Sequence, residues 1–271
     1  MNEKLPVLIK IEWIKTRHYR AFKILSLVYV VLLVLVFIGA QRFINNITIQ
    51  SNDDSFTPFR GLSFYQTKYI WQNFTYIAGY LKIIPALLII LLITNEFSFF
   101  TMRQQLISGL SRKDFLTGKL LVISALIVGI VILIALTALV LGLLHQQVGD
   151  VSLLNGGLWF LPLHALELLT YLIFSMMIAF IFRRSGIATI VFVLYALIGE
   201  RIVSFILPGS IGDYLPLNAA GSLIPLPNNT LTSSIGLTFR STVDIQTILS
   251  CVIYCFLFTA IIYFLLRWRD A

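Results

Sequence analysis

Charged residues are scarce in this chain: Asp, Glu, Lys and Arg together make up 12% of its 271 residues. A soluble domain uses about 25% charged residues to cover its surface, so much of this surface must face something other than water. The alternation of apolar and polar residues typical of a membrane β-barrel is missing as well. Long apolar runs are present instead, such as Ile83–Ile93 and Leu120–Leu144, and the mean hydropathy is +0.92. Because a helix satisfies its own backbone hydrogen bonds within one such run, the composition predicts an all-α integral membrane protein.

Signatures of catalytic and metal sites are also missing. Cys251 and Cys255 lie four residues apart, on one face of a helix, where two cysteines rarely have the geometry of a disulfide. Without a nearby His or a third Cys, we expect them to pack as small apolar residues. His164 and Glu167 are three residues apart and could share a metal, but the sequence supplies no second pair of ligands. The sequence therefore predicts a non-catalytic membrane subunit without a metal site.

Six apolar runs approach the roughly 20 residues that a helix needs to cross a bilayer. The fourth and fifth are separated only by Arg183–Gly186, which predicts a tight hairpin. We expect the first run to be a retained signal anchor, because no clear small-residue cleavage site follows it. The predicted spans, within a single domain covering residues 1–271, are Phe22–Ala40, Phe74–Thr94, Leu120–Leu144, Leu158–Phe182, Ile187–Leu207 and Ile245–Leu266.

The distribution of Lys and Arg predicts the orientation of these spans. Four cations, Arg42, Arg60, Lys68 and Arg240, lie in loops on one side. Most of the 20 lie on the other side: Lys4, Lys10, Lys15, Arg17, Arg20, Lys23, Arg103, Arg112, Lys113, Lys119, Arg183, Arg184, Arg267 and Arg269. Basic loops stay in the cytoplasm, so both termini are predicted to be cytoplasmic. The net charge of +8 reflects this bias and attraction to anionic lipids, and it does not indicate nucleic-acid binding.

Two segments outside the spans have patterns of their own. In the N-terminal 1–21, apolar residues recur at helical spacing among cations, which predicts an amphipathic helix at the membrane interface, or simply a basic anchor. The first outer loop, Gln41–Asn73, is polar and contains Asp53, Asp54 and Pro58. The last outer segment, Pro208–Val243, is rich in proline yet apolar. It is too apolar for a disordered loop, so we expect short, broken helices that re-enter the membrane.

The most informative loop is Asn95–Lys119. Thr101–Ser108 has no helix breaker, Gly109 suits a left-handed helix end, and Ser111 suits the N-cap of the helix that leads into the third span. A short helix would therefore lie across the cytoplasmic face between two spans. From the residues alone, it is either a docking helix for a partner or a plain amphipathic connector.

This loop resembles the corresponding loop of ABC-2 type transporter permeases, the membrane subunits of bacterial ABC exporters. The resemblance rests on Glu96, Thr101, Arg103, Gly109, Ser111, Arg112, Phe115, Gly118 and Lys119 in this order, and the architecture of the whole chain fits as well. It implies that the helix, including Gln104, is a coupling helix that docks on a separate ATPase subunit, with Arg103 and Arg112 meeting acidic groups there.

The resemblance also implies the partners and the location. Such permeases pair with a second copy or a homologous permease, bind two ATPase subunits, and lie in the bacterial cytoplasmic (inner) membrane. ATP and Mg would be bound by the partner, since this chain has no G-x-x-x-x-G-K-[ST] phosphate loop and no expected cofactor. The substrate is left open. The alternatives are a non-transporting anchor or immunity component, or a secondary transporter, for which inverted repeats are missing.

Four ionisable residues lie inside the predicted spans: Lys82, Glu167, Glu200 and Arg201. Such groups are costly in a bilayer and usually meet a partner or a cavity. Counted along straight helices, all four lie at a similar depth in the outer half. The sequence therefore predicts a charge network that pairs Lys82 or Arg201 with Glu167 or Glu200. It would either brace the helices or face substrate, and the alternative is that the charged ends reach the outer surface.

Overall fold

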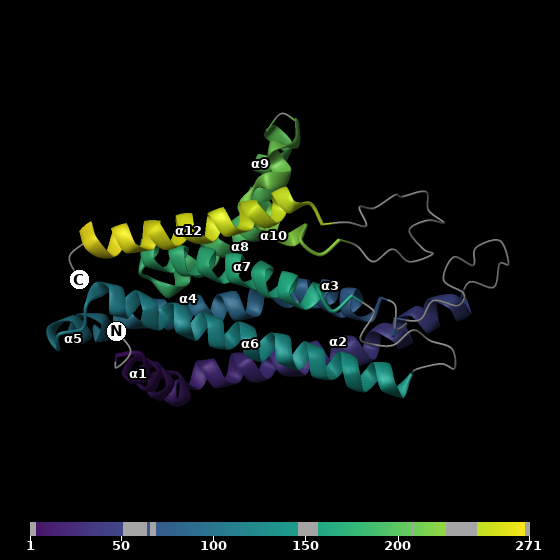
Figure 1. The fold of residues 1–271 in the computed structure, drawn as a ribbon, viewed down its shortest axis with the longest axis horizontal. Coiled ribbons are helices and arrows are strands. Elements are labelled where there is room, and N and C mark those ends of the chain that lie inside the picture. Colours follow the sequence, from purple (N-terminus) through teal and green to yellow (C-terminus); the bar gives the residue numbers. More distant parts are fainter. Residues whose placement is uncertain are drawn as a thin grey trace.

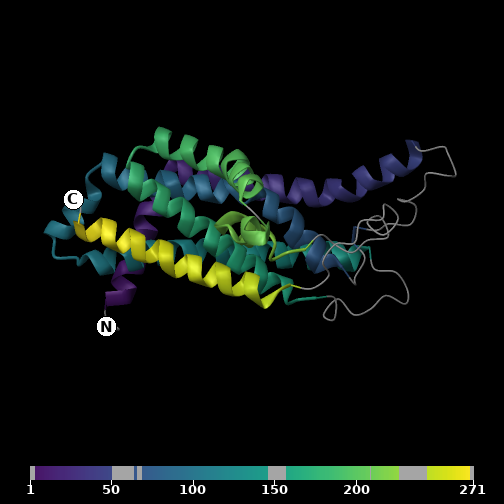
Figure 2. The same cartoon turned by 90° about the horizontal axis from the view of Figure 1, so that it is seen from above.

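The computed structural model describes residues 4–50, 64–65, 69–145, 157–207, 209–225 and 243–268, and this part is helical without any strand. The predicted loop residues Asp53, Asp54 and Pro58, and the stretch 226–242, lie outside it. The helices form one elongated bundle (Figures 1 and 2). In chain order, they are α1 (Lys4–His18), α2 (Arg20–Gln50), α3 (Ile70–Leu81), α4 (Ile83–Ser98), α5 (Thr101–Ile107), α6 (Arg112–Leu144), α7 (Phe160–Phe182), α8 (Ser185–Leu194), η2 (Tyr195–Gly199), α9 (Glu200–Ile206), η3 (Gly209–Tyr214), α10 (Pro216–Gly221) and α12 (Ile245–Trp268).

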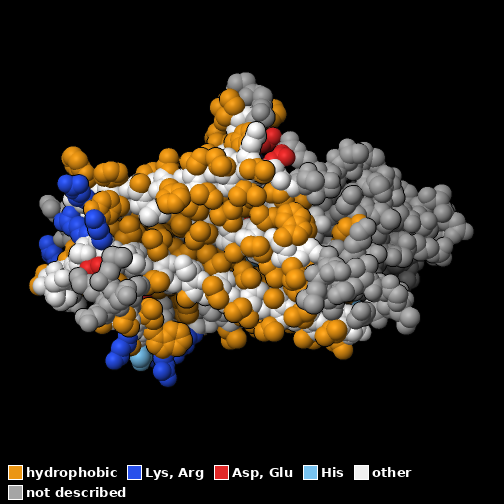
Figure 3. Space-filling model, in the orientation of Figure 1, with side chains coloured by type: hydrophobic (Ala, Val, Ile, Leu, Met, Phe, Trp, Pro, Cys, Tyr) orange, Lys and Arg blue, Asp and Glu red, His pale blue; other side chains and the backbone are white. Residues whose placement is uncertain are grey.

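Helix α7 is the centre of the bundle. It packs against α3, α4, α6, α8, α10 and α12. In its most apolar stretch 72% of the residues are buried, against 11–22% in the other unbroken candidate spans. The helices around α7 turn apolar side chains outward, as Figure 3 shows for one face.

The six predicted spans correspond to five unbroken helices, α2, α6, α7, α8 with η2 and α9, and α12, together with the pair α3 and α4. The second span, predicted over Phe74–Thr94, is formed by the pair α3 and α4, which are bent by 44° at Lys82. Pro85 explains the bend: it lacks an N–H to donate to Leu81, and its ring crowds that carbonyl.

The fifth span also departs from the straight helix predicted over Ile187–Leu207. After α8 the chain forms one π-helical turn, η2, and α9 then projects from the side of the bundle (Figures 1 and 2). The 3-10 helix η3, which follows α9 and runs back toward the bundle, packs closely on α9. A Cβ at Gly212 would lie 2.9 Å from the backbone of Ser204, so the turn requires glycine there. We call α9 and η3 the side hairpin.

The two outer segments differ from their predictions in different ways. Residues 41–50, predicted to begin a loop, continue helix α2. The apolar segment after the fifth span forms short helices, as predicted: in α10 the side chains of Leu217, Ala219 and Ala220 are buried. Ala219 and Ala220 join Phe160 of α7 and Cys251 of α12 in a small core of their own, whereas Leu217 belongs to the main core. Both cysteines are free and buried, as predicted from their spacing.

Lys and Arg side chains gather at one end of the bundle, as Figure 3 shows. This end holds α1, α5, the start of α6 and the end of α12, and we call it the basic end. Helix α1 lies across the other helices there (Figure 2). It is separated from α2 at Tyr19, so the predicted N-terminal helix is a distinct element. Its buried residues, Leu8, Glu12 and Thr16, are spaced four apart on one face.

Candidate functional site

The loop between α4 and α6 has the local structure that its sequence predicts. Helix α5 covers Thr101–Ile107, and Gly109 follows with a left-handed φ of 95°. Ser111 caps α6: its Oγ accepts the backbone N–H of Asp114 at 3.1 Å, and the Asp114 carboxylate accepts the N–H of Ser111 at 3.3 Å. The sharp turn from α4 into α5 is made by Phe100, a non-glycine residue held at φ 54°. The short helix therefore sits at a fixed angle between two spans.

Helix α5 presents an exposed surface at the basic end. Arg103, Gln104 and Gly109 are exposed, and the apolar side chain of Ile107 is 80% exposed. Met102, on the opposite face, is buried and anchors the helix to the bundle. A rigid helix with a basic and apolar outer face has the form of a surface that docks into a groove on another protein.

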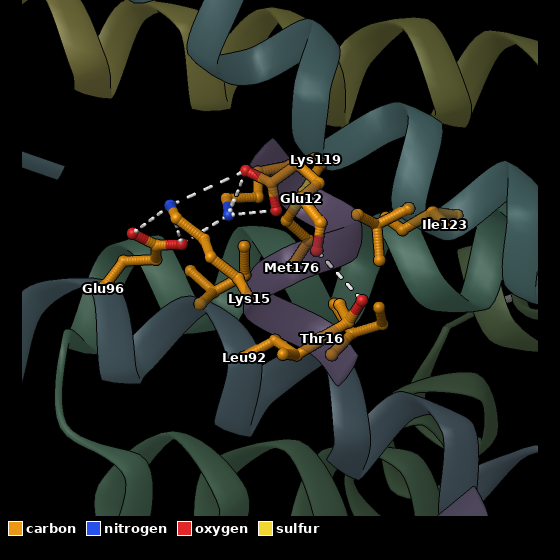
Figure 4. A pocket seen from close by; sticks show the side chains of 11 residues that line it. Glu12, Lys15, Thr16, Leu92, Glu96, Lys119, Ile123 and Met176 are labelled. Atoms are coloured by element: carbon orange, nitrogen blue, oxygen red, sulfur yellow. Dashed lines mark hydrogen bonds and ion pairs between the residues drawn. The ribbon is translucent and has the colours of Figure 1, made fainter. Parts of the chain in front are cut away.

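Beside the start of α5 lies an ion cluster formed by the buried Glu12, Glu96 and Lys119 and the partly exposed Lys15 (Figure 4). The Lys119 Nζ lies 2.5 Å from Glu96 Oε1 and 2.8 Å from each carboxylate oxygen of Glu12. The Lys15 Nζ adds contacts to both Glu96 oxygens, at 2.9 and 3.1 Å. Two cations thus balance two anions, and each buried carboxylate has an opposite charge in contact. We call these residues the four-residue ion cluster.

The cluster ties three helices and the start of α5 to one point. Its members come from α1, α4 and α6, and the Thr101 Oγ1 at the start of α5 donates to Glu96 Oε2. Glu96 and Lys119 are 6% and 5% exposed. Their side chains are therefore buried beside the start of α5 and are not accessible at the surface.

Glu12 and Lys15 are not among the site residues predicted from the sequence. A signal was present: Glu12 is the one acidic residue of α1, and it falls in register with Leu8 and Thr16 on the face that turns inward. An acidic residue on an apolar helix face calls for a buried partner.

Arg112 has a different place from the one expected for a docking residue. It is half-buried, and its Nη1 donates to the backbone oxygens of Leu266 and Arg267 at 2.7 and 2.6 Å. These carbonyls belong to the last turn of α12, where the helix leaves them without helical partners. Arg112 therefore joins α6 to the end of α12.

Lys82 and Glu167, both within predicted spans, form a second ion pair in which Glu167 is buried and Lys82 is partly buried. The Lys82 Nζ lies 2.5 Å from Glu167 Oε1, and the His164 Nδ1 lies 3.0 Å from Glu167 Oε2. The break between α3 and α4 places Lys82 opposite α7. Gly79 leaves the room that this requires, because a Cβ there would lie 3.2 Å from the Glu167 carboxylate. The sequence analysis considered His164 only as a metal ligand, and the structure shows it as a partner of Glu167.

Glu200 and Arg201 are arranged differently. The Glu200 Oε1 accepts the backbone N–H groups of Leu217 and Asn218 at 2.8 and 2.9 Å, so it holds the start of α10. Within the described part of the chain, neither residue makes an ion pair. The predicted depth of these two was counted along a straight fifth span, whereas this span contains the π-helical turn η2. Even so, Lys82, Glu167, Glu200 and Arg201 line one cavity of about 340 Å³.

The comparisons with known proteins add the family. No curated protein matches this sequence. Residues 7–271 match the family model described as ABC-2 family transporter protein, and the chain therefore belongs to that family.

Proposed function

We propose that this chain is the membrane-spanning permease subunit of an ATP-driven exporter. As a member of the ABC-2 family it is a multi-pass membrane protein and a component of a transmembrane transporter, and the family generally works with an ABC ATPase subunit. The observation that supports coupling to an ATPase is the exposed face of α5, held rigidly between the second and third spans.

The contacts around α5 give this coupling a mechanical route. A displacement of α5 would be transmitted to α4 through the turn at Phe100 and through the hydrogen bond from Thr101 to Glu96. Lys119 passes the same displacement to α6, and Glu12 passes it to α1. Because buried ion pairs tolerate little separation, these helices would move together when the ATPase subunits close.

The distribution of charge supports the orientation of the complex. The basic end, with α1, α5 and the end of α12, would face the cytoplasm of a bacterial cell, as the positive-inside rule predicts. Both termini and the docking surface would then lie on the side where ATP is available. ATP and Mg would be bound by the ATPase subunits, and this chain would contribute the path through the membrane.

The docking surface can be tested with two substitutions on α5. We expect the double variant Arg103→Glu, Ile107→Asp to lose at least about 30-fold in affinity for the ATPase subunit, since an interface hot spot contributes about 2 kcal/mol or more. The measurement is co-purification of the ATPase with the tagged permease, together with the permease-stimulated rate of ATP hydrolysis.

The matched control is Arg184→Glu, which reverses an exposed Arg in the hairpin between α7 and α8. It should leave the complex intact if α5 is the main docking element. Arg112 is unsuitable as a docking probe because it holds α12. Unchanged binding by the α5 variant would exclude α5 as the docking helix.

The side hairpin supports pairing with a second permease. It projects from the bundle, and its Phe205 is 93% exposed, with Ile202, Ile206 and Ile211 exposed beside it. An apolar hairpin extending from one protomer can reach into the helices of a second copy, which would cover these side chains.

We expect Phe205→Ser to shift the purified permease from dimer to monomer, or to weaken the dimer by about ten-fold or more. The control is Phe256→Ser, which removes a similarly exposed Phe from α12 and should leave the dimer unchanged. Light scattering of the protein in detergent measures both. If the two variants dimerise equally, the side hairpin is not the interface.

A further inference from the structure

The cavity beside the side hairpin is a polar chamber in an apolar bundle. Its walls come from α3, the start of α4, α7, η2, α9 and α10, and it encloses about 340 Å³. Gly79 and Gly221 line it, so two helices contribute space where side chains would fill it. At its rim Tyr80 and Leu197 are largely exposed, so it opens on the apolar side of the bundle and not only along its axis.

Within this cavity two charged groups are already satisfied. Lys82 and Glu167 pair with each other, and the Lys82 Nζ also lies 5.0 Å from the centre of the Tyr171 ring. His164 takes the second oxygen of Glu167. These contacts brace α3, α4 and α7 and leave little of either charge to bind a ligand.

Two other charged side chains that line the cavity, Glu200 and Arg201, make no ion pair within the described part of the chain. Glu200 is only 2% exposed, yet its Oε2 has no hydrogen-bond partner among the described residues. Its other oxygen is fixed by Leu217 and Asn218, so the carboxylate cannot rotate away without uncovering two backbone donors. The exposed Arg201 guanidinium lines the same cavity and makes no ion pair within the described part of the chain. A buried carboxylate oxygen without a donor is costly, which indicates that a ligand supplies one.

The free groups specify the chemistry of that ligand. A carboxylate oxygen is best paired with a strong hydrogen-bond donor such as a protonated amine. The rings of Tyr76 and Tyr80, which line the same cavity, favour a cation as well. A guanidinium calls for a phosphate or carboxylate, which it binds through two N–H groups. The apolar rim suits hydrocarbon. A molecule that meets all three has an amine close to an acidic group and an apolar tail.

We propose that this cavity binds the head group of a zwitterionic amphiphile, with its amine on Glu200 Oε2, its phosphate or carboxylate on Arg201, and its tail toward the membrane. The inference rests on the proposed transport function in naming the substrate class of the permease. The same head-group chemistry occurs in aminophospholipids and in small soluble phosphoamines, and the tail distinguishes these sources.

The test measures binding to the purified full-length chain in detergent, without ATPase or nucleotide. The probes are phosphatidylethanolamine, phosphatidylglycerol, which has the phosphate and tails but no amine, and glycerophosphoethanolamine, which has the head group but no tails. The readout is the ligand-induced rise in thermal unfolding temperature, titrated to saturation. We expect saturable binding of phosphatidylethanolamine only.

The decisive variants keep the fold and remove one charge each. Glu200→Gln retains an oxygen for Leu217 and Asn218 but loses the anion, and should weaken phosphatidylethanolamine binding about ten-fold or more. Arg201→Gln should weaken it to a similar degree. Asp213→Asn, a neutralisation on the exposed part of the side hairpin, should leave it unchanged.

The outcomes separate the possibilities. Equal binding of phosphatidylglycerol, or unchanged binding by Glu200→Gln, would overturn the assignment of the amine to Glu200. Equal binding of glycerophosphoethanolamine would overturn the membrane source of the ligand. Because no ATPase is present, a negative result leaves the proposed coupling function standing, and a failure of α5 to dock leaves this binding site standing.

Discussion

Replacing Lys119 with Met is expected to lower the free energy of unfolding by about 3–5 kcal/mol, the cost of removing one partner from a buried ion pair. Lys119 contacts both Glu12 and Glu96 within the four-residue ion cluster. Without it, two buried carboxylates would share only Lys15, which is partly exposed and lies 3.8 Å from Glu12. The loss should therefore exceed that of any single surface substitution.

Chemical unfolding of the purified permease in detergent measures this loss. The matched control is Lys113→Met on the same helix, since Lys113 is exposed and a surface change costs about 0.5 kcal/mol or less. Adding Glu12→Gln to Lys119→Met leaves one anion, Glu96, for the remaining cation, Lys15, and should restore part of the stability. If Lys119→Met unfolds like Lys113→Met, the cluster does not hold the helices together.

The cluster also predicts a functional consequence for coupling. Glu96 holds the start of α5 through Thr101, so a loosened cluster should allow α5 to move without moving α4 and α6. We therefore expect Lys119→Met to keep ATPase binding through the intact face of α5 while it reduces transport per ATP hydrolysed.

The second large effect is expected at Glu167, where reversal to Lys should cost about 3–5 kcal/mol and impair assembly in the membrane. Glu167 is buried against Lys82 and His164, so a Lys there would place two ammonium groups in contact beside a buried imidazole.

A charge swap makes this prediction specific. The double variant Lys82→Glu, Glu167→Lys restores opposite charges at the same two positions and should recover at least half of the lost stability, whereas Lys82→Glu alone should be as harmful as Glu167→Lys. The yield of folded protein after size-exclusion chromatography measures all three, with Asp213→Lys on the exposed hairpin as the control. If Glu167→Lys accumulates normally, bracing by this pair is refuted.

The local features of the chain are predicted well by its sequence, for reasons that act within a few residues. Long apolar runs must form helices because their backbone groups have no other partner in a bilayer. Glycine at a left-handed position marks the end of a helix, and serine before a helix marks its start. The roles of Gly109 and Ser111 were therefore predicted correctly. The family resemblance rests on the same stretch of the chain, where the residues that carry it follow one another in a fixed order and spacing.

Which charges meet was decided by the tertiary structure. Glu12 could not be assigned to Lys119, 107 residues away, because the contact depends on how α1 crosses the bundle. Arg112 could not be recognised as a cap for α12, because that contact needs the ends of two distant helices side by side. The depth predicted for Glu200 assumed a straight helix. The structure has the π-helical turn η2 just before Glu200, and the Glu200 carboxylate contacts the start of α10.

The sequence by itself determined that this is a helical membrane protein with about six spans, a basic end and a short helix between the second and third spans, since hydrophobic burial and backbone hydrogen bonding act along the chain. Only the tertiary structure decided that Lys82 meets Glu167 and that Glu200 and Arg201 face one cavity with an oxygen and a guanidinium to spare. The physical reason is that the strength of a buried charge contact depends on distances between helices, and packing and helix breaks set those distances.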